Sequence, residues 1–169
     1  MMSTTATIQL LPLTTEHYPA VSAIYAEGIA TGQATFATDV PAWAEWDASH
    51  LPHSRVIALS EAGQVAGWAA LTPVSGRCVY RGVAEVSVYV GAAHRGRGVG
   101  QRLLAQLVAE SEQHGIWTLQ AGIMRLNAAS LRLHEQAGFR LVGVRERLGQ
   151  LQGQWHDVCL LERRSRVVG

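Results

Sequence analysis

Charged residues are scarce in this sequence, and it contains no long apolar run. Asp, Glu, Lys and Arg together make up 16% of the 169 residues, whereas about 25% is usual for a globular protein. So little charge indicates that some surface is buried in an oligomer, and we expect a homodimer. No apolar stretch approaches the ~18 residues of a membrane span, so we expect no membrane partner. The start, MMSTTATIQL, lacks the basic region and apolar core of a signal peptide, and we expect a cytoplasmic protein.

The sequence is also poor in the clusters that hold metal ions or form disulfides. Its two cysteines, Cys78 and Cys159, lack CxxC spacing, and we expect two reduced thiols. His50 and His53 stand on either side of a proline, and no two histidines have HxxxH spacing, so we predict no metal site. The formal net charge of +1 gives no reason to expect nucleic acid or anionic lipid as a partner.

Apolar residues, by contrast, are abundant at 48%, which is enough for one domain with a sizeable core. Neither a repeat nor a linker divides the sequence. We expect a single domain over residues 1–169, with its core at about 8–161. Residues 162–169 are predicted to form a C-terminal tail, of which the segment RSRVVG at 164–169 is expected to fray.

Hydrophobic periodicity and turn residues predict the order of helices and strands. Strands are expected at residues 6–13, 55–60, 64–72, 84–90, 116–123, 139–148 and 154–163. Helices are expected at 16–29, around Pro41, Trp43 and Trp46 with Asp39 as the cap, at 99–113 and at 127–137. The last two strands would form a hairpin around Gly149 to Gly153. This order predicts an α/β fold, with a mixed, mostly antiparallel sheet flanked by helices.

Three glycines stand between a predicted strand and a predicted helix, in the segment RGRGVG at residues 95–100. The start of a helix exposes unpaired N–H groups and a partial positive charge. Successive N–H groups in a glycine-rich turn can surround an anion, and glycine adopts positive φ and lets the backbone approach a ligand closely. With Arg95, Arg97 and Arg102 nearby, the segment is typical of a phosphate or pyrophosphate site.

Other phosphate-binding loops fit this segment poorly. A Walker loop needs Gly-Lys followed by Ser or Thr, which is not present. A dinucleotide fingerprint needs glycine where Gln101 stands, and an acidic residue about 20 positions later, where Leu119, Gln120 and Ala121 stand. A plain strand-to-helix turn is the remaining alternative.

The segment resembles the (Gln/Arg)-x-x-Gly-x-(Gly/Ala) loop of the GCN5-related N-acetyltransferases (GNAT), which holds the pyrophosphate of coenzyme A. YRGVAEVSVYV, NAASLRLHEQAGF and GQWHDV together resemble the phosphinothricin and methionine sulfoximine acetyltransferase branch of that family. The likeness extends from about Ile8 to Leu161. It implies a single-domain GNAT fold, acetyl-CoA as the cosubstrate and a homodimer.

By this resemblance, the loop and the elements beside it bind acetyl-CoA. Asn127 would touch the pantetheine or the adjoining backbone, and a bulge in the strand before the loop would open a splay that admits the pantetheine arm. The predicted cofactor-binding residues are Val88, Tyr89, Val90, Arg95, Gly96, Arg97, Gly98, Val99, Gly100, Asn127 and Ser130.

Acetyl transfer to an amine needs a group that takes a proton from the ammonium, and the departing thiolate benefits from a proton. Strand alternation puts Glu85, Ser87 and Tyr89 on one face. By resemblance, Glu85 is the general base and acts through water. Many relatives carry a tyrosine that protonates the thiolate where this chain has His134, and histidine can donate or accept near neutral pH. The alternatives are a salt-bridged Glu85 and a His134 that only shapes the pocket.

The acceptor site is predicted mainly from residues before that strand. By resemblance, Arg81 faces the carboxylate of a small amino acid, since its planar fork suits bidentate pairing; a solvated loop arginine is the alternative. The predicted substrate-binding residues are Phe36, Tyr80, Arg81, Gly82 and Val83. Trp43 or Trp46 would either wall this pocket or pack in the core. Residues 155–157 are interpreted as hairpin and pocket rim.

We therefore expect an N-acetyltransferase that moves acetyl from acetyl-CoA to the primary amine of a small amino-acid-like substrate, of the phosphinothricin or methionine sulfoximine type. Direct attack in a ternary complex is expected, because neither cysteine lies in a recognisable nucleophile site. Two alternatives remain: acetylation of a protein N-terminus or another amine, and a coenzyme A-binding sensor without catalysis. Glu85 and His134 argue against the sensor.

Overall fold

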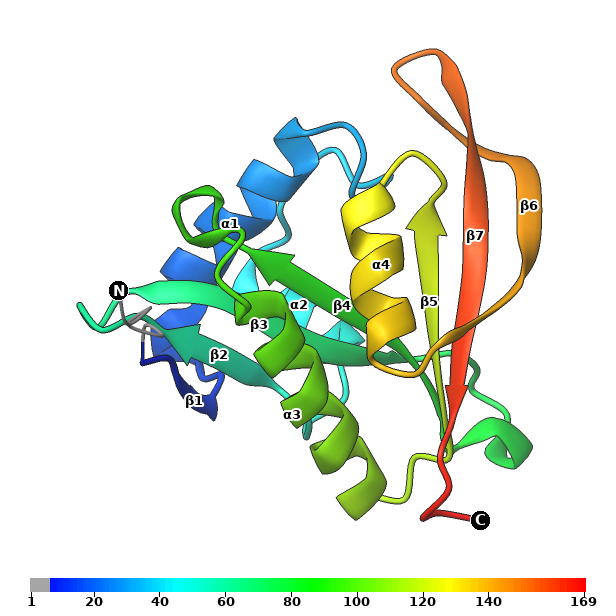
Figure 1. Ribbon diagram of the computed structural model, residues 1–169, viewed down its shortest axis with the longest axis horizontal. Helices are drawn as coiled ribbons and strands as arrows, with labels where there is room; N and C mark the ends of the chain where they lie inside the picture. The colour runs from blue at the N-terminus through cyan, green and yellow to red at the C-terminus, as the bar shows by residue number, and fades with distance from the viewer. Residues whose placement is uncertain (1–6) are drawn as a thin grey trace, which may run out of the picture.

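The computed structural model describes residues 7–169, so residues 1–6, including the first residue of the predicted N-terminal strand, lie outside it. The described residues form one sheet of seven strands with four α-helices around it (Figure 1). The strands are β1 (Gln9–Pro12), β2 (Val56–Leu59), β3 (Val65–Pro73), β4 (Val83–Val90), β5 (Thr118–Met124), β6 (Arg140–Leu151) and β7 (Gln154–Arg164). The helices are α1 (Tyr18–Ala30), α2 (Trp43–Ser49), α3 (Val99–Gln113) and α4 (Ala128–Gln136).

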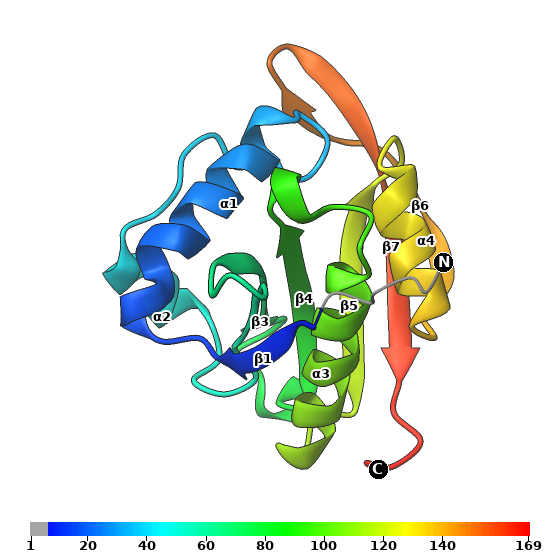
Figure 2. The same ribbon diagram turned by 60° about the vertical axis from the view of Figure 1, so that its left-hand side comes forward.

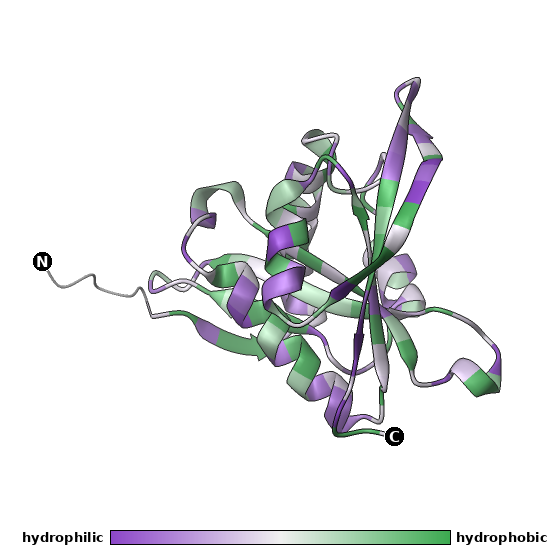
Figure 3. Cartoon of the chain, turned by 45° about the vertical axis from the view of Figure 1, so that its right-hand side comes forward, coloured by the Kyte–Doolittle hydropathy of each residue, from purple (hydrophilic) through white to green (hydrophobic). Residues whose placement is uncertain are grey.

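The sheet runs in the order β1-β2-β3-β4-β5-β7-β6. Every neighbouring pair is antiparallel except β4 and β5, which are joined through α3, as a parallel pair requires a crossover. The predicted α/β fold with a mixed, mostly antiparallel sheet is confirmed. β6 stands at one edge and forms with β7 a long hairpin that projects beyond the rest of the sheet (Figure 3).

Helices cover both faces of the sheet (Figures 1 and 2). On one face, α3 and α4 pack on an apolar cluster that includes the fully buried Leu103 and Leu107. On the other face, α1 and α2 enclose an aromatic cluster around Trp46 and Trp68. Trp43 stacks on Trp46 at a ring distance of 5.6 Å, so both tryptophans of α2 pack in the core.

The two central strands separate toward their C-terminal ends. β4 pairs with β5 only at residues 83–85. The bulge predicted in β4 is not found where β4 pairs with β3. Residues 84–90 of β4 pair with residues 67–73 of β3 in one unbroken register. The opening arises instead because β5 leaves β4 after Glu85 and continues beside β7 alone.

The start of α2 differs from the prediction. The helix begins at Trp43 with Ala42 as its N-cap, so Pro41 lies outside it and Asp39 does not cap it. The carbonyl of Pro41 accepts a hydrogen bond from the hydroxyl of Tyr18. That contact ties the segment before α2 to α1.

The C-terminal predictions also need correction. The turn of the β6–β7 hairpin is Gln152-Gly153, both with positive φ, so Gly149 belongs to β6. Residues 162–164 continue β7, and Ser165 is buried, with its hydroxyl donating to the Glu112 carboxylate over 2.9 Å. The expected fraying is therefore wrong for residues 164 and 165, because Arg164 belongs to β7 and Ser165 is bonded to α3.

Candidate active site

A cavity of about 1110 Å³ opens where β4 and β5 separate. Its volume exceeds the ~300–1,000 Å³ of most small-molecule pockets, so it has room for a long ligand and a second molecule. Most predicted site residues meet in its lining: Phe36, Glu85, Val88, Tyr89, Val90, Arg95, Gly96, Gly98, Val99, Gly100, Asn127, Ser130 and His134.

The glycine segment forms the turn that begins α3. Gly96 and Gly98 have φ of +73° and +77°, a conformation that strains other residues, and Gly98 is the N-cap of α3. The first turn of α3 therefore leaves N–H groups without intrahelical partners beside the cavity. Gly100 lines the cavity as predicted and also has a role in packing. A Cβ there would lie 3.2 Å from Leu133, so its small size lets α3 approach α4 closely.

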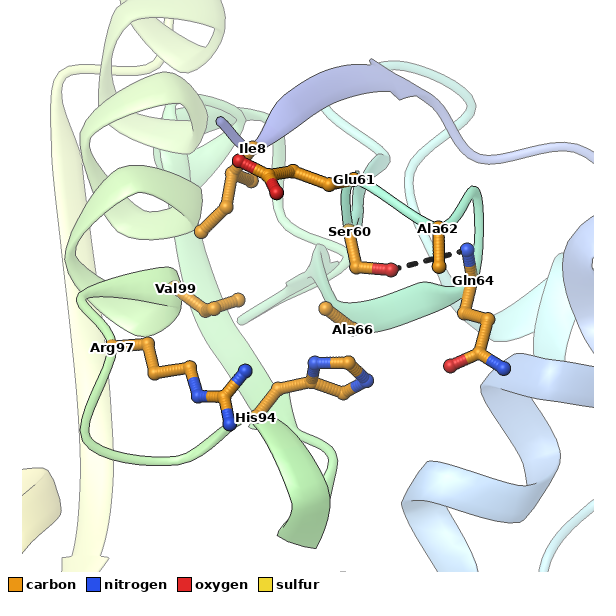
Figure 4. A pocket seen from close by; sticks show the side chains of 9 residues that line it. All are labelled: Ile8, Ser60, Glu61, Ala62, Gln64, Ala66, His94, Arg97 and Val99. Atoms are coloured by element: carbon orange, nitrogen blue, oxygen red, sulfur yellow. Dashed lines mark hydrogen bonds between the residues drawn. The ribbon is translucent and has the colours of Figure 1, made fainter. Parts of the chain in front are cut away.

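Arg97 lies outside the main cavity. Its side chain lines a second, smaller cavity of about 300 Å³ with His94, Glu61 and Gln64 (Figure 4). Figure 4 shows Arg97 and His94 reaching into this cavity from the segment before α3, across from the β2–β3 turn. Arg95, in contrast, lines the main cavity, so the two arginines of the segment serve different cavities.

The start of α4 is hydrogen-bonded to the segment after α1, which also lines the main cavity. Asn127 caps the helix through its Oδ1, which accepts from the backbone N–H of Ser130 over 3.2 Å. Its Nδ2 donates to the carbonyl oxygen of Gln33 over 3.4 Å. Asn127 thus joins α4 to the segment that contains Phe36.

His134 is a buried residue of α4 with 4% of its surface exposed. Its Nδ1 lies 2.7 Å from the carbonyl oxygen of Ser130. Because a carbonyl only accepts, Nδ1 carries the proton and Nε2 of the neutral ring offers a lone pair. Burial lowers the pKa of His134 below its ordinary value, partly opposed by the bond to Ser130. The ring is therefore neutral at pH 7.

Glu85 lies at the last point where β4 and β5 pair. It stands opposite Gln120 in the parallel register, and Nε2 of Gln120 donates to its Oε1 over 3.3 Å. A Cβ at Gly122 would lie 3.7 Å from the same oxygen, so the missing side chain leaves space beside the carboxylate. Glu85 forms no ion pair with any residue in the range 7–169. The half-buried carboxylate is thus available to the cavity.

The cavity reaches both faces of the sheet through the gap between β4 and β5. Val88 and Val90 pack toward α3 and α4, and we call this the turn side because the glycine turn and His134 line it. The predicted alternation puts Glu85 and Tyr89 on the other face, the glutamate side. There Tyr89 stacks on Trp68 at 4.9 Å, and burial raises the pKa of its phenol well above the ordinary value.

The glutamate side contains residues that the sequence did not point to. Arg145 and Leu148 of β6 line it, beside the predicted Phe36, whose ring lies where a side chain at Gly149 would be. Alternation along β6 does not reveal these positions, because the register with β7 shifts between Arg145 and Gly149. The alternation of side chains between the two faces of the sheet is therefore interrupted within β6, and the faces of Arg145 and Leu148 cannot be predicted from it.

Four predicted acceptor residues do not line the cavity. Tyr80, Arg81, Gly82 and Val83 stand at the N-terminal end of β4, away from the glycine turn. The guanidinium of Arg81 lies 5.6 Å from the ring centre of Trp117. Gly82 packs so closely on that ring that a Cβ would lie 2.0 Å from it. Within one chain, these residues organise the start of β4 around Trp117.

The cysteines and histidines form no further site in the part of the chain that the structure describes. Cys78 is exposed and Cys159 is buried, both as free thiols, and neither lines the main cavity. Within residues 7–169, no three His, Cys, Asp or Glu side chains are arranged to hold a metal ion. In the same range, no helix combines the length and apolarity needed to cross a bilayer.

Comparison with known proteins gives a consistent result. A family model described as the acetyltransferase (GNAT) family matches residues 22–139. L-methionine sulfoximine/L-methionine sulfone acetyltransferase of Salmonella typhimurium is 35% identical over 121 residues, which are 72% of this chain and 70% of that protein.

Two solved structures are similar to the whole fold, each with a TM-score of 0.85. One is ribosomal-protein-alanine N-acetyltransferase from Brucella melitensis, 31% identical, with 93% of this chain and 99% of that chain covered. The other is a GNAT superfamily phosphinothricin acetyltransferase from Sinorhizobium meliloti in complex with acetyl-CoA, 29% identical, with 94% and 88% covered.

Proposed function

The chain belongs to the GNAT family of acetyltransferases and uses acetyl-CoA, and on that premise we propose that it acetylates the primary amine of a small amino-acid-like molecule, such as methionine sulfoximine or phosphinothricin. One observation carries the proposal. A single cavity joins a glycine turn at a helix start to a half-buried glutamate on the opposite face of the sheet. We also propose a cytoplasmic location, where acetyl-CoA is available.

The turn side fits acetyl-CoA, which supplies the thioester carbonyl that an amine attacks. The N–H groups at the start of α3 and the guanidinium of Arg95 would hold the pyrophosphate. Val88 and Val90 line the gap through which the pantetheine arm would pass, and Asn127 and Ser130 stand on its α4 side. The positive φ of Gly96 and Gly98 supports this assignment, because it favours glycine, whose lack of a side chain leaves space beside the turn.

The glutamate side suits the acceptor amine. Glu85 would take a proton from the ammonium, directly or through one water, and the neutral nitrogen would then form the new C–N bond as the C–S bond breaks. Nε2 of His134 accepts in the resting state, so His134 can protonate the departing sulfur only after it has received a proton, which would be the one that the nitrogen loses as the amide forms. Its lowered pKa would make that proton easy to release. Neither cysteine lines the cavity, which favours direct attack in a ternary complex over an acyl-enzyme.

A homodimer is part of the proposal. β6 is an edge strand, and Leu141, Val142 and Val144 on it are 39–51% exposed. An exposed edge with apolar side chains is a common site of association between chains. Sedimentation at micromolar concentration should give twice the 18.2 kDa chain mass. A mass near 18.2 kDa would count against the dimer.

A second acceptor class has its own support. The similar structure from Brucella melitensis is named for acetylation of a ribosomal protein's alanine, so the N-terminus of a protein is the alternative acceptor. Release of coenzyme A should be measured with methionine sulfoximine, phosphinothricin, free amino acids and short peptides. Turnover of the two free amino-acid analogues supports the proposal. Turnover of peptides alone would replace it with the protein acceptor.

A further inference from the structure

The glutamate side of the cavity contains an arginine that is placed to meet the acceptor. Arg145 of β6 stands opposite Val158 of β7, and Val158 stands opposite Met124 of β5. Residues directly opposite one another in antiparallel strands project to the same face. Arg145 therefore projects to the face that carries Val158 and, two residues along β5 from Met124, Gly122.

This face leads directly to the proposed base. The Cβ position of Gly122 lies 3.6 Å from a methyl group of Val158 and 3.7 Å from Oε1 of Glu85. Val158 and Glu85 thus border the same open space from opposite sides. Arg145 is one strand beyond Val158 and lines the same cavity. An acceptor whose amine is near Glu85 would have Arg145 at its other end.

The charge of Arg145 is not neutralised by the protein. Two other arginines of this part of the sheet are paired, Arg140 with Glu162 and Arg125 with Asp157. Arg145 forms no ion pair, and its side chain no hydrogen bond, with any residue in the range 7–169. Of the other arginines in the lining, Arg95 and Arg132 come from the glycine turn and α4. The glutamate side therefore has one carboxylate and one unpaired guanidinium.

We propose that Arg145 binds the anionic group of the acceptor, a carboxylate or a phosphinate, and so selects amines that carry an anion. A guanidinium presents a planar fork that pairs with two oxygens of such a group. The proposal rests on the proposed function, and it assigns to Arg145 the contact that the sequence assigned to Arg81. Arg81 lies over Trp117 and does not line the cavity.

The test compares acceptors that differ only in their anions. Methionine sulfone carries the α-carboxylate alone, phosphinothricin carries both a carboxylate and a phosphinate, and the decarboxylated amine of each lacks the carboxylate. Arg145→Ala should raise the KM of phosphinothricin, which carries both anions, about tenfold to hundredfold with little change in kcat, as expected when a charged hydrogen bond made equally in the ground and transition states is lost. Arg145→Lys should recover part of the loss.

The pattern over the four acceptors identifies the anion. If the carboxylate is bound, both amino acids lose affinity and both decarboxylated amines do not. If the phosphinate is bound, phosphinothricin and its decarboxylated amine lose affinity and methionine sulfone does not. Arg147→Ala is the matched control, because Arg147 lies two residues further on β6, is exposed and does not line the cavity. Thermal melting verifies that each variant is folded.

Three results would overturn the assignment. One is an equal loss on all four acceptors, which would mean that Arg145 serves the fold. The second is an equal selective loss in Arg147→Ala, and the third is a selective loss in Arg81→Ala with none in Arg145→Ala. A wild-type enzyme that acetylates none of the four would reject the proposed acceptor class itself, and with it this role of Arg145. The wild-type assay alone reveals that outcome, so failure of the proposed acceptor class is distinguished from failure of the role of Arg145.

Discussion

Gln120 donates a hydrogen bond to Glu85 at the last residue pair that β4 and β5 form before they separate. The bond holds the carboxylate at the mouth of the gap, with open space on its other side beside Gly122. The strand geometry that creates the cavity thus also positions the group that would take a proton from the acceptor.

Replacement of Glu85 by glutamine tests that role. The substitution keeps the size of the side chain, and the new amide can still accept from Gln120 through its carbonyl oxygen, but it cannot take a proton. Loss of a general base commonly costs ~10²–10⁴ in rate, so we expect kcat to fall by that range at every pH from about 6 to about 9. Glu146→Gln, on an exposed position of β6, should be unaffected. Turnover of Glu85→Gln within a few-fold of wild type would remove Glu85 from the mechanism.

The glycine turn can be tested separately from the fold. Gly98 has φ of +77°, and no atom approaches its Cβ position closer than 4.0 Å, so Gly98→Val adds backbone strain and crowds the space beside the turn. We expect a sharp loss of acetyl-CoA affinity by calorimetry. Gly63 is the control, since it has φ of +74° with nothing within 4 Å and lies in the β2–β3 turn. If Gly63→Val weakens acetyl-CoA equally, backbone strain rather than the site explains the result.

Local patterns in the sequence predicted the turn side better than the glutamate side. The glycine turn, the Asn127 cap and the alternation at Glu85 are set within a few residues, and the structure has all three. Phe36 and Arg145 meet the cavity from segments more than 100 residues apart. The sequence predicted Phe36 as a pocket residue, whereas the position of Arg145 depends on strand order and on the register shift in β6, which no local pattern encodes. Arg81 shows the opposite case, because a motif suggested a contact that packing against Trp117 does not provide.

His134 should make stability depend on pH. Because burial lowers its pKa in the folded state, the unfolded chain takes up a proton as the pH falls through its ordinary value of about 6.5, and the folded chain does not. The free energy of unfolding should therefore decrease on acidification, by up to about 1.4 kcal/mol per pH unit from this group, until the folded pKa is reached. Above about pH 7.5 the group should have no such effect.

Urea unfolding of wild type and His134→Gln between about pH 7.5 and about pH 5.5 measures this contribution. The variant should show a shallower decrease, whatever its absolute stability. It should not become flat, because burial also lowers the pKa of His50 and His53. His50→Gln gives the comparison for a half-buried histidine outside the cavity. Identical slopes for wild type and His134→Gln would contradict the neutral, buried state assigned to this ring.

Gly149 offers a test of the acceptor pocket that leaves both proposed catalytic residues in place. A Cβ at this position would lie 2.7 Å from the ring of Phe36, so Gly149→Ala must displace that ring from the cavity wall. We expect the acceptor KM to rise while the affinity for acetyl-CoA, measured by calorimetry, stays unchanged. Gly143→Ala is the matched control, since it lies on the same strand with nothing within 4 Å of its Cβ position. A loss of acetyl-CoA affinity in Gly149→Ala, or the same acceptor KM in both variants, would show that Phe36 does not form the acceptor wall.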